Sequence, residues 1–142
     1  MPVNDASTSD SPVSRILPRI DDANRPFWTG GADGELIIMR GSASGRFVHP
    51  PSDATAEDGP LEPVAVSGRG TVFTFTVNEQ PFHPAVPTPY VVALVELDEQ
   101  EGLRIPTNIV HCPVEDVAIG MQVQVTFEQH GEVFVPLFEP AR

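Results

Sequence analysis

The chain has 142 residues, of which 40% are hydrophobic, and a formal net charge of −12 at pH 7. This length suits one domain with a real core and leaves no room for a second full domain. The acidic balance opposes contact with a nucleic-acid backbone, because nucleic-acid-binding domains usually present basic faces. A single cysteine, Cys112, excludes an intramolecular disulfide and therefore a disulfide-stapled secreted scaffold.

Nothing in the sequence predicts contact with a membrane. No apolar run approaches the roughly 18 residues that indicate a transmembrane helix, and the polar N-terminus has no signal-peptide core. We therefore expect a soluble, cytoplasmic protein.

The first 31 residues fall into two parts. Residues 1–14 are rich in Ser, Asp, Thr and Pro without apolar periodicity, which predicts a disordered tail. Residues 15–31 contain two prolines and several large apolar side chains, with Asp and Asn as plausible helix caps, which predicts one or two short helical turns. Phe27 and Trp28 supply much of this segment's apolar area. Either they fill a gap in the core or they anchor a partner protein.

Residues 32–63 predict a small hairpin followed by a loop. Two short strand-like runs, 35–40 and 46–49, flank the Gly- and Ser-containing stretch 41–45, a pattern typical of a tight turn. Residues 50–63 contain four prolines and four acidic residues, which predicts an irregular loop. The composition changes near Val64, where we expect the next unit to begin.

The remaining residues, 64–142, predict an all-β domain. Strands are expected over residues 68–77, 90–97, 103–109, 121–128 and 132–138. The two glycines that flank Arg69 predict a bulge or bend where the first strand begins. The second strand is almost continuously apolar, which is typical of a strand buried on both faces.

One short helical turn, expected over residues 113–118, separates the third predicted strand from the fourth. Five strands with a helical turn at this point match the partly open Greek-key barrel of the OB-fold. A generic five-stranded barrel or a sandwich fragment is the alternative. The predicted fold class is mainly β: an OB-fold barrel preceded by a short helix and a hairpin.

Seven short motifs carry a resemblance to a known family. They are Phe27-Trp28, Gly34-Glu35-Leu36, Pro50-Pro51, and residues 66–77, 89–97, 107–110 and 119–123. In this order and spacing they resemble small proteins that join a rubredoxin-like zinc ribbon to an OB-fold and accompany thiolases and thiolase-like lipid-transfer proteins. The resemblance covers about residues 16–138.

The resemblance implies a function within a complex. Such proteins look like non-catalytic accessory subunits that bind a thiolase-superfamily enzyme and support its acyl-CoA chemistry. That chemistry includes thiolysis, condensation, acyl transfer and retro-aldol cleavage, with steroid side-chain degradation as one setting. Catalytic residues are then expected on the partner, and the partner's CoA thioester is the implied small molecule.

One departure from the family pattern concerns its zinc site. The family carries two Cys-x-x-Cys pairs, which supply four thiolates for a tetrahedral structural zinc. In this sequence the four positions align with Gly41, Ser44, Thr55 and Asp58. None of these residues replaces a thiolate. We therefore expect a degenerate ribbon without zinc. Residues 35–63 are then either the loosest folded part of the chain or a segment that docking on a partner orders.

The other chemical candidates are few. His49, His83, His111 and His130 lack the spacing of a metal site, and Cys112 has no nucleophile motif around it. We expect Cys112 to be a small, partly buried apolar residue.

Three residues are candidates for contacts to CoA or to the partner. Arg69 either pairs with local carboxylates or contacts the CoA phosphates or the partner. His83 and Tyr90 flank the loop between the first two barrel strands, where OB-folds commonly bind ligands.

Two other functional classes compete with the accessory subunit. A nucleic-acid-binding OB module would need a basic groove with stacking aromatic residues, and the net charge of −12 argues against it. A free-standing enzyme, such as a small acyl-CoA hydrolase or hydratase, would need a catalytic group that no motif nominates.

Overall fold

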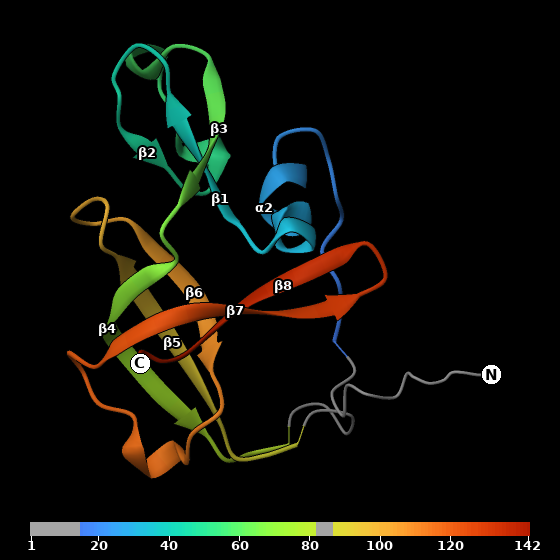
Figure 1. Ribbon diagram of the computed structural model, residues 1–142, viewed down its shortest axis with the longest axis vertical. Helices are drawn as coiled ribbons and strands as arrows, with labels where there is room; N and C mark the ends of the chain where they lie inside the picture. The colour runs from blue at the N-terminus through green and yellow to red at the C-terminus, as the bar shows by residue number, and fades with distance from the viewer. Residues whose placement is uncertain (1–14, 82–86) are drawn as a thin grey trace.

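The computed structural model describes residues 15–81 and 87–142, so His83 lies outside the described residues. Two sheets make up most of the fold (Figure 1). One is a three-stranded sheet in residues 36–66, which we call the ribbon lobe, and the other is a closed five-stranded barrel. Among the described residues, no helix is long and apolar enough to cross a bilayer.

The N-terminal helical segment is short, as expected. It consists of α2 (Arg25–Thr29) and the 3-10 turn η1 (Gly30–Asp33). Asp21 and Asn24 cap each other: each side-chain oxygen accepts the other's backbone N–H at 2.8 Å. Pro26 lies in the first turn of α2, where its missing N–H has no helical partner to lose.

The ribbon lobe contains one more strand than expected. Its strands are β1 (Leu36–Gly41), β2 (Phe47–Val48) and β3 (Leu61–Val66), with the 3-10 turns η2 (Pro51–Asp53) and η3 (Ala56–Asp58) between the last two. The prediction of an irregular loop through residue 63 is wrong, since β3 begins at Leu61 and crosses the predicted boundary. Pro63 is tolerated there because β3 is an edge strand in the order β2-β1-β3.

The barrel has the strand order β4-β5-β6-β8-β7 and closes through a β4–β7 pairing. Its strands are β4 (Arg69–Asn78), β5 (Tyr90–Leu97), β6 (Arg104–Ile109), β7 (Gln122–His130) and β8 (Val133–Pro140). The β6–β8 pairing is parallel and the other pairings are antiparallel. The 3-10 turn η4 (Val114–Asp116) lies between β6 and β7. This arrangement confirms the expected OB-fold.

Strand β4 contains a bulge, although not where the glycines predicted it. The register with β5 shifts between Val72 and Thr74, so Phe73 is the extra residue. The bulge reverses the alternation: Val72 is buried and Phe73 is 44% exposed. Gly70 instead permits a close approach of backbones, since a Cβ there would lie 2.5 Å from the carbonyl oxygen of Glu96.

Strand β5 is buried on one face only. Val91, Ala93, Val95 and Leu97 are buried, while Val92 between them is 40% exposed. The prediction of a strand buried on both faces is wrong, because none of the described residues forms a second layer over Val92. Val92 and Leu94 on the outward face of this strand are nonetheless apolar.

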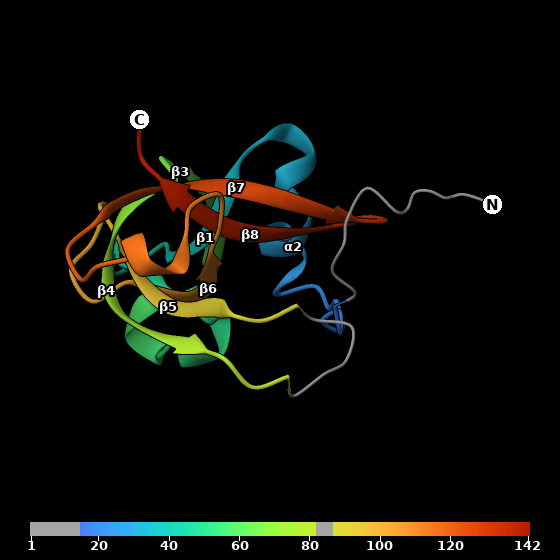
Figure 2. The same cartoon turned by 90° about the horizontal axis from the view of Figure 1, so that it is seen from below.

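The lobe and the barrel share one hydrophobic core. Leu36 and Ile38 of β1 belong to the same buried cluster as Val95, Leu97 and Ile105 of the barrel. The side-chain amide of Gln100, in the β5–β6 turn, adds two hydrogen bonds to the backbone of Phe47 in the lobe, at 2.8 and 2.9 Å. Figure 2 shows the barrel from below, with α2 beside β8, and α2 contacts both β8 and β1.

Candidate functional site

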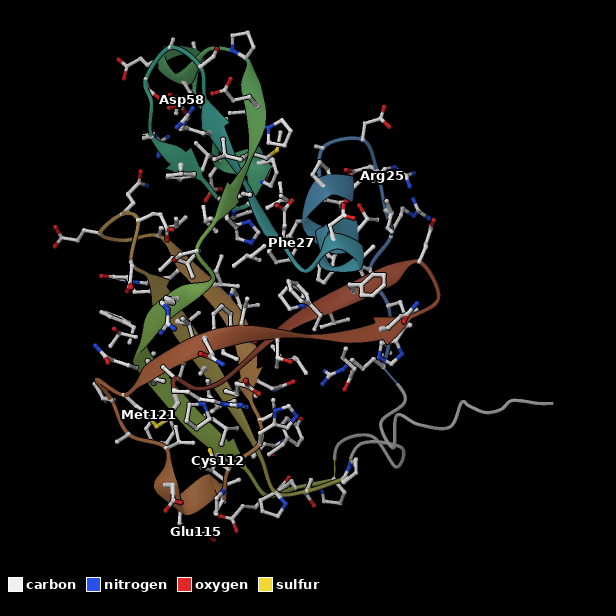
Figure 3. All side chains as sticks on the ribbon, in the orientation of Figure 1. Arg25, Phe27, Asp58, Cys112, Glu115 and Met121 are labelled. Atoms are coloured by element: carbon white, nitrogen blue, oxygen red, sulfur yellow. The ribbon has the colours of Figure 1, made fainter. Side chains whose placement is uncertain are left out.

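Four polar residues meet around Asp58, which Figure 3 shows at the end of the ribbon lobe distant from the barrel. We call Ser44, Arg46, Thr55 and Asp58 the Asp58 cluster. Asp58 ends η3 and is only 1% exposed, whereas the turn after β1 supplies Ser44 and the approach to β2 supplies Arg46. A buried carboxylate requires hydrogen-bonding partners, so the environment of Asp58 determines what this site can bind.

Both carboxylate oxygens of Asp58 are saturated. Oδ1 accepts the Ser44 hydroxyl at 2.7 Å and Arg46 Nε at 2.8 Å. Oδ2 accepts the second Arg46 nitrogen at 2.9 Å, the Thr55 backbone N–H at 2.8 Å and the Thr55 hydroxyl at 3.3 Å. The hydrogen bonds from the Thr55 backbone, Ser44 and Arg46 hold the pKa of Asp58 well below its usual range. The group is therefore a carboxylate at neutral pH.

The four positions at which the family resemblance led us to expect cysteines are neighbours in space. Ser44 and Thr55 both bond to Asp58, and a Cβ on Gly41 would lie 2.6 Å from Ser44 Oγ and 2.7 Å from Asp58 Cβ. These residues do not fit a structural zinc: they offer no thiolate, and a guanidinium already binds the carboxylate. Within residues 15–81 and 87–142, no three His, Cys, Asp or Glu side chains are arranged to hold a metal ion.

The aromatic pair on α2 faces inward in part. The Phe27 ring lies 4.8 Å from the Trp28 ring in an edge arrangement and 4.6 Å from the His49 ring, centroid to centroid. Phe27 also packs against the shared core, between the lobe and the barrel in Figure 3. Phe27 therefore helps to fill the core, whereas Trp28 is partly buried, is not among the residues packed against that core, and is a candidate partner contact.

The structure does not bring Arg69 and Tyr90 together. Arg69 begins β4, and Tyr90 pairs with Asn78 at the opposite end of that strand, roughly 30 Å away along it. The Tyr90 hydroxyl accepts a hydrogen bond from the Asn78 amide at 2.6 Å. Arg69 is exposed, and its guanidinium forms no ion pair with the described residues, so the expected local pairing is not seen among them.

The outer wall of the barrel presents a partly apolar face. The Arg104 guanidinium lies over the exposed Phe73 ring, 3.6 Å from its centroid, and also bonds to Glu96 at 3.2 Å. Val92, on the same wall, is 40% exposed. Sequence reasoning missed this face because it placed β5 in a doubly buried position.

A second polar group was also missed, because its members lie far apart in the chain. The buried Glu139 accepts hydrogen bonds from His111 Nδ1 and from the Gln124 amide, and lies 3.3 Å from a guanidinium nitrogen of Arg142. The hydrogen bonds from His111 and Gln124 lower the pKa of Glu139. His111 has a left-handed backbone, with φ of 64°. The neighbouring Cys112 packs partly buried against the core, as expected, and burial raises the pKa of its thiol.

Comparison with known proteins identifies the family. The family model of the ChsH2 C-terminal OB-fold domain matches residues 63–128. A solved chain described as "Ltp2-ChsH2(DUF35) aldolase" is 36% identical and has a TM-score of 0.74, and the superposition covers 89% of this chain and 100% of that chain. The protein belongs to the DUF35 family.

Curated relatives of this DUF35 chain have two kinds of name. The 3-oxo-4,17-pregnadiene-20-carboxyl-CoA hydratase alpha subunit of Mycobacterium tuberculosis is 40% identical over 116 residues, which are 80% of this chain and 36% of the relative. A DUF35 domain-containing scaffold protein of Methanocaldococcus jannaschii is 44% identical over 73 residues, which are 51% of this chain and 50% of the relative. The chain thus spans about half, or less, of these relatives' length.

Proposed function

We propose that this protein is a non-catalytic accessory subunit that binds a thiolase-superfamily enzyme of the lipid-transfer type and supports its acyl-CoA chemistry. The observation that carries the proposal is the superposition on a chain of an Ltp2-ChsH2(DUF35) aldolase, which covers 100% of that chain. The name of that structure joins a DUF35 chain to a second protein in one enzyme. A heteromeric complex is accordingly the working state that we propose.

The names of the relatives support both the accessory role and the acyl-CoA chemistry of the proposed complex. The word "scaffold" stands in the name of a relative that aligns with 73 residues of this chain, and the name of the hydratase alpha subunit contains a CoA thioester. The reactions open to the proposed complex are thiolysis, condensation, acyl transfer and retro-aldol cleavage, in lipid or steroid degradation. Because acyl-CoA thioesters are intracellular substrates, we also propose a cytoplasmic location.

Partner and CoA contacts are assigned to separate places on the chain. Trp28 is partly buried and its ring is held edge-on against the Phe27 ring, so we propose that it is preorganised to contact the partner. The exposed Arg69 guanidinium and the far end of β4 at Tyr90 are the proposed CoA or partner contacts on the barrel. A net charge of −12 disfavours the nucleic-acid alternative, which we do not propose.

The test is co-expression with a thiolase-like protein from the same genome. Tagged chain and partner should elute together, with a fixed ratio by light scattering, and the complex should turn over an acyl-CoA substrate faster than the partner alone. Two proteins that stay separate, together with unchanged partner solubility and activity, would refute the proposal.

Two aromatic variants locate the contact. Trp28→Ala should weaken the complex at least about tenfold if Trp28 enters the partner. Phe73→Ala, an exposed aromatic residue on the barrel wall, is the matched control and should leave the affinity within about threefold. The reverse result would move the interface to the barrel wall and remove Trp28 from it.

A further inference from the structure

The Asp58 cluster joins parts of the lobe that are distant in sequence. Ser44 belongs to the turn between β1 and β2, and Thr55 and Asp58 belong to the segment between β2 and β3. The Asp58 carbonyl accepts the Ala43 N–H at 2.8 Å, and the Ser42 N–H donates to the Pro60 carbonyl at 2.9 Å. One residue, Asp58, thus ties the two connections of the lobe together through both its side chain and its backbone.

The hydrogen bonds around Asp58 leave no oxygen lone pair of its carboxylate free to bind a cation. A carboxylate offers about four lone-pair positions, and five N–H or O–H groups already point at those of Asp58. The Ser44 hydroxyl, which donates to Asp58, also accepts the Arg46 backbone N–H at 3.2 Å. A divalent ion would have to displace the Arg46 guanidinium, whose positive charge opposes its approach.

The space between Gly41 and Asp58 is closed as well. A Cβ on Gly41 would lie 2.7 Å from both the Cβ and the carbonyl oxygen of Asp58. Since the second of these atoms belongs to the backbone, no side-chain rotation relieves the contact. The end of β1 therefore packs directly on η3, where a metal site would require ligand side chains with an ion between them.

We propose that the Asp58 cluster is a metal-independent lock of the ribbon lobe, in which the Arg46–Asp58 ion pair does the cross-linking that a structural zinc would otherwise do. The lock needs Arg46, because without its guanidinium the Asp58 carboxylate would remain buried with no positive charge to balance its own. The lobe is then folded whatever the supply of zinc.

The test is hydrogen exchange of lobe amides, measured on the isolated full chain without any partner. Arg46→Gln should accelerate exchange of the Ala43 and Gly41 amides by more than about tenfold, because it removes two charge-assisted hydrogen bonds from a buried group. Arg40→Gln is the matched control: the Arg40–Glu62 pair lies in the same lobe, with side chains 40% and 45% exposed. It should change exchange by less than about threefold.

A second experiment, with a chelator, distinguishes a lock made of polar side chains from a metal site. Protein prepared with excess zinc should carry sub-stoichiometric zinc, and EDTA should leave the exchange of the Ala43 amide unchanged. One zinc per chain, EDTA-accelerated exchange in the lobe, or equal effects of Arg46→Gln and Arg40→Gln would each overturn the proposal.

Adding Asp58→Asn to Arg46→Gln keeps the proposal testable if the single variant folds poorly. The double variant removes both charges and should recover part of the lost protection, because the two residues are coupled. A double variant in which the losses simply add would overturn the pairing.

Discussion

The barrel and the far end of the ribbon lobe are stabilised by different kinds of interaction. The barrel interior is filled by fully buried apolar side chains such as Val72, Val95 and Phe138. The far end of the lobe is organised around a buried carboxylate with five hydrogen-bond donors. Apolar packing is roughly proportional to area and has little direction, whereas each polar donor has one correct position.

This difference predicts different tolerance to change. Volume-conserving swaps in the barrel should be mild, because what matters there is filling the space at native density. Near Asp58, isosteric changes that delete a single donor should be costly, because a buried polar group then stays unsatisfied. A large loss of stability from an isosteric substitution in the barrel, or no loss from deleting a hydrogen-bond donor in the lobe, would contradict this comparison.

The largest effect is expected from Phe138→Ala. Phe138 is 0% exposed in β8, so truncation should lower the free energy of unfolding by about 3–5 kcal/mol. Urea unfolding followed by circular dichroism measures this loss. Because Leu36 and Ile38 share this core, lobe and barrel should still unfold in one transition.

The matched control for Phe138 is Phe73, which is 44% exposed on the barrel wall. Phe73→Ala should cost about 1 kcal/mol or less, most of it from the stacked Arg104 guanidinium. Equal losses of unfolding free energy for the two phenylalanines would contradict the expected effect of burial. Two separate unfolding transitions in Phe138→Ala would show that the shared core does not couple the lobe to the barrel.

An intermediate effect is expected from Gly31→Ala, at the junction between η1 and the β7–β8 hairpin. The added Cβ would lie 2.4 Å from Phe134 Cβ and 2.7 Å from Phe127 Cδ1. Overpacking of this kind costs about 1–3 kcal/mol. The one tryptophan, Trp28, reports the displacement of α2 by its fluorescence. Ala32→Ser, at the exposed neighbouring position, should leave both stability and fluorescence unchanged.

The smallest effect is a pH dependence at His49. Burial lowers the pKa of His49, and the Asp53 carboxylate partly opposes this shift. The unfolded chain therefore binds the proton more readily. Stability is complete above about pH 6.5, the unfolded pKa of histidine, and declines as the pH falls through the lower folded pKa.

Denaturation at several pH values between 7 and 5 tests this sign. His49→Gln should flatten the dependence in that range while keeping the lobe folded. A stability that rises on acidification, or a slope unchanged in His49→Gln, would contradict it. The result also bears on the comparison of lobe and barrel, because the His49 ring contacts Phe27 where the lobe meets the α2 segment.

The barrel was predictable from the sequence because its strands carry a strong local signal. Alternation in β7 and the apolar run of β5 locate strands whatever their neighbours are. The bulge at Phe73 was not predictable in place, because it depends on the β4–β5 register, and the glycines nearby suggested another position. The outer face of β5 was misjudged because periodicity cannot distinguish one apolar cover from two.

The Asp58 cluster illustrates the limit at the site. The family resemblance singled out Gly41, Ser44, Thr55 and Asp58 as expected cysteine positions, but it did not single out Arg46. Its partner is 12 residues away, and only the folded turn brings the guanidinium to the carboxylate. The Glu139 group is similar, with His111 separated by 28 residues. Long-range polar pairs of this kind leave no periodic trace.

The hydrogen bonds of Gln100 restrict which residues this position can carry in a chain with this fold. Its amide donates to the Phe47 carbonyl and accepts the Phe47 N–H, so it copies the pairing of one strand residue with another. Only a side-chain amide offers a donor and an acceptor in one plane, and asparagine is one methylene shorter. Substitution by glutamate would set a carboxylate against a carbonyl oxygen. The identity of a residue in a barrel turn is thus constrained by the lobe, so the two parts are expected to evolve as one unit.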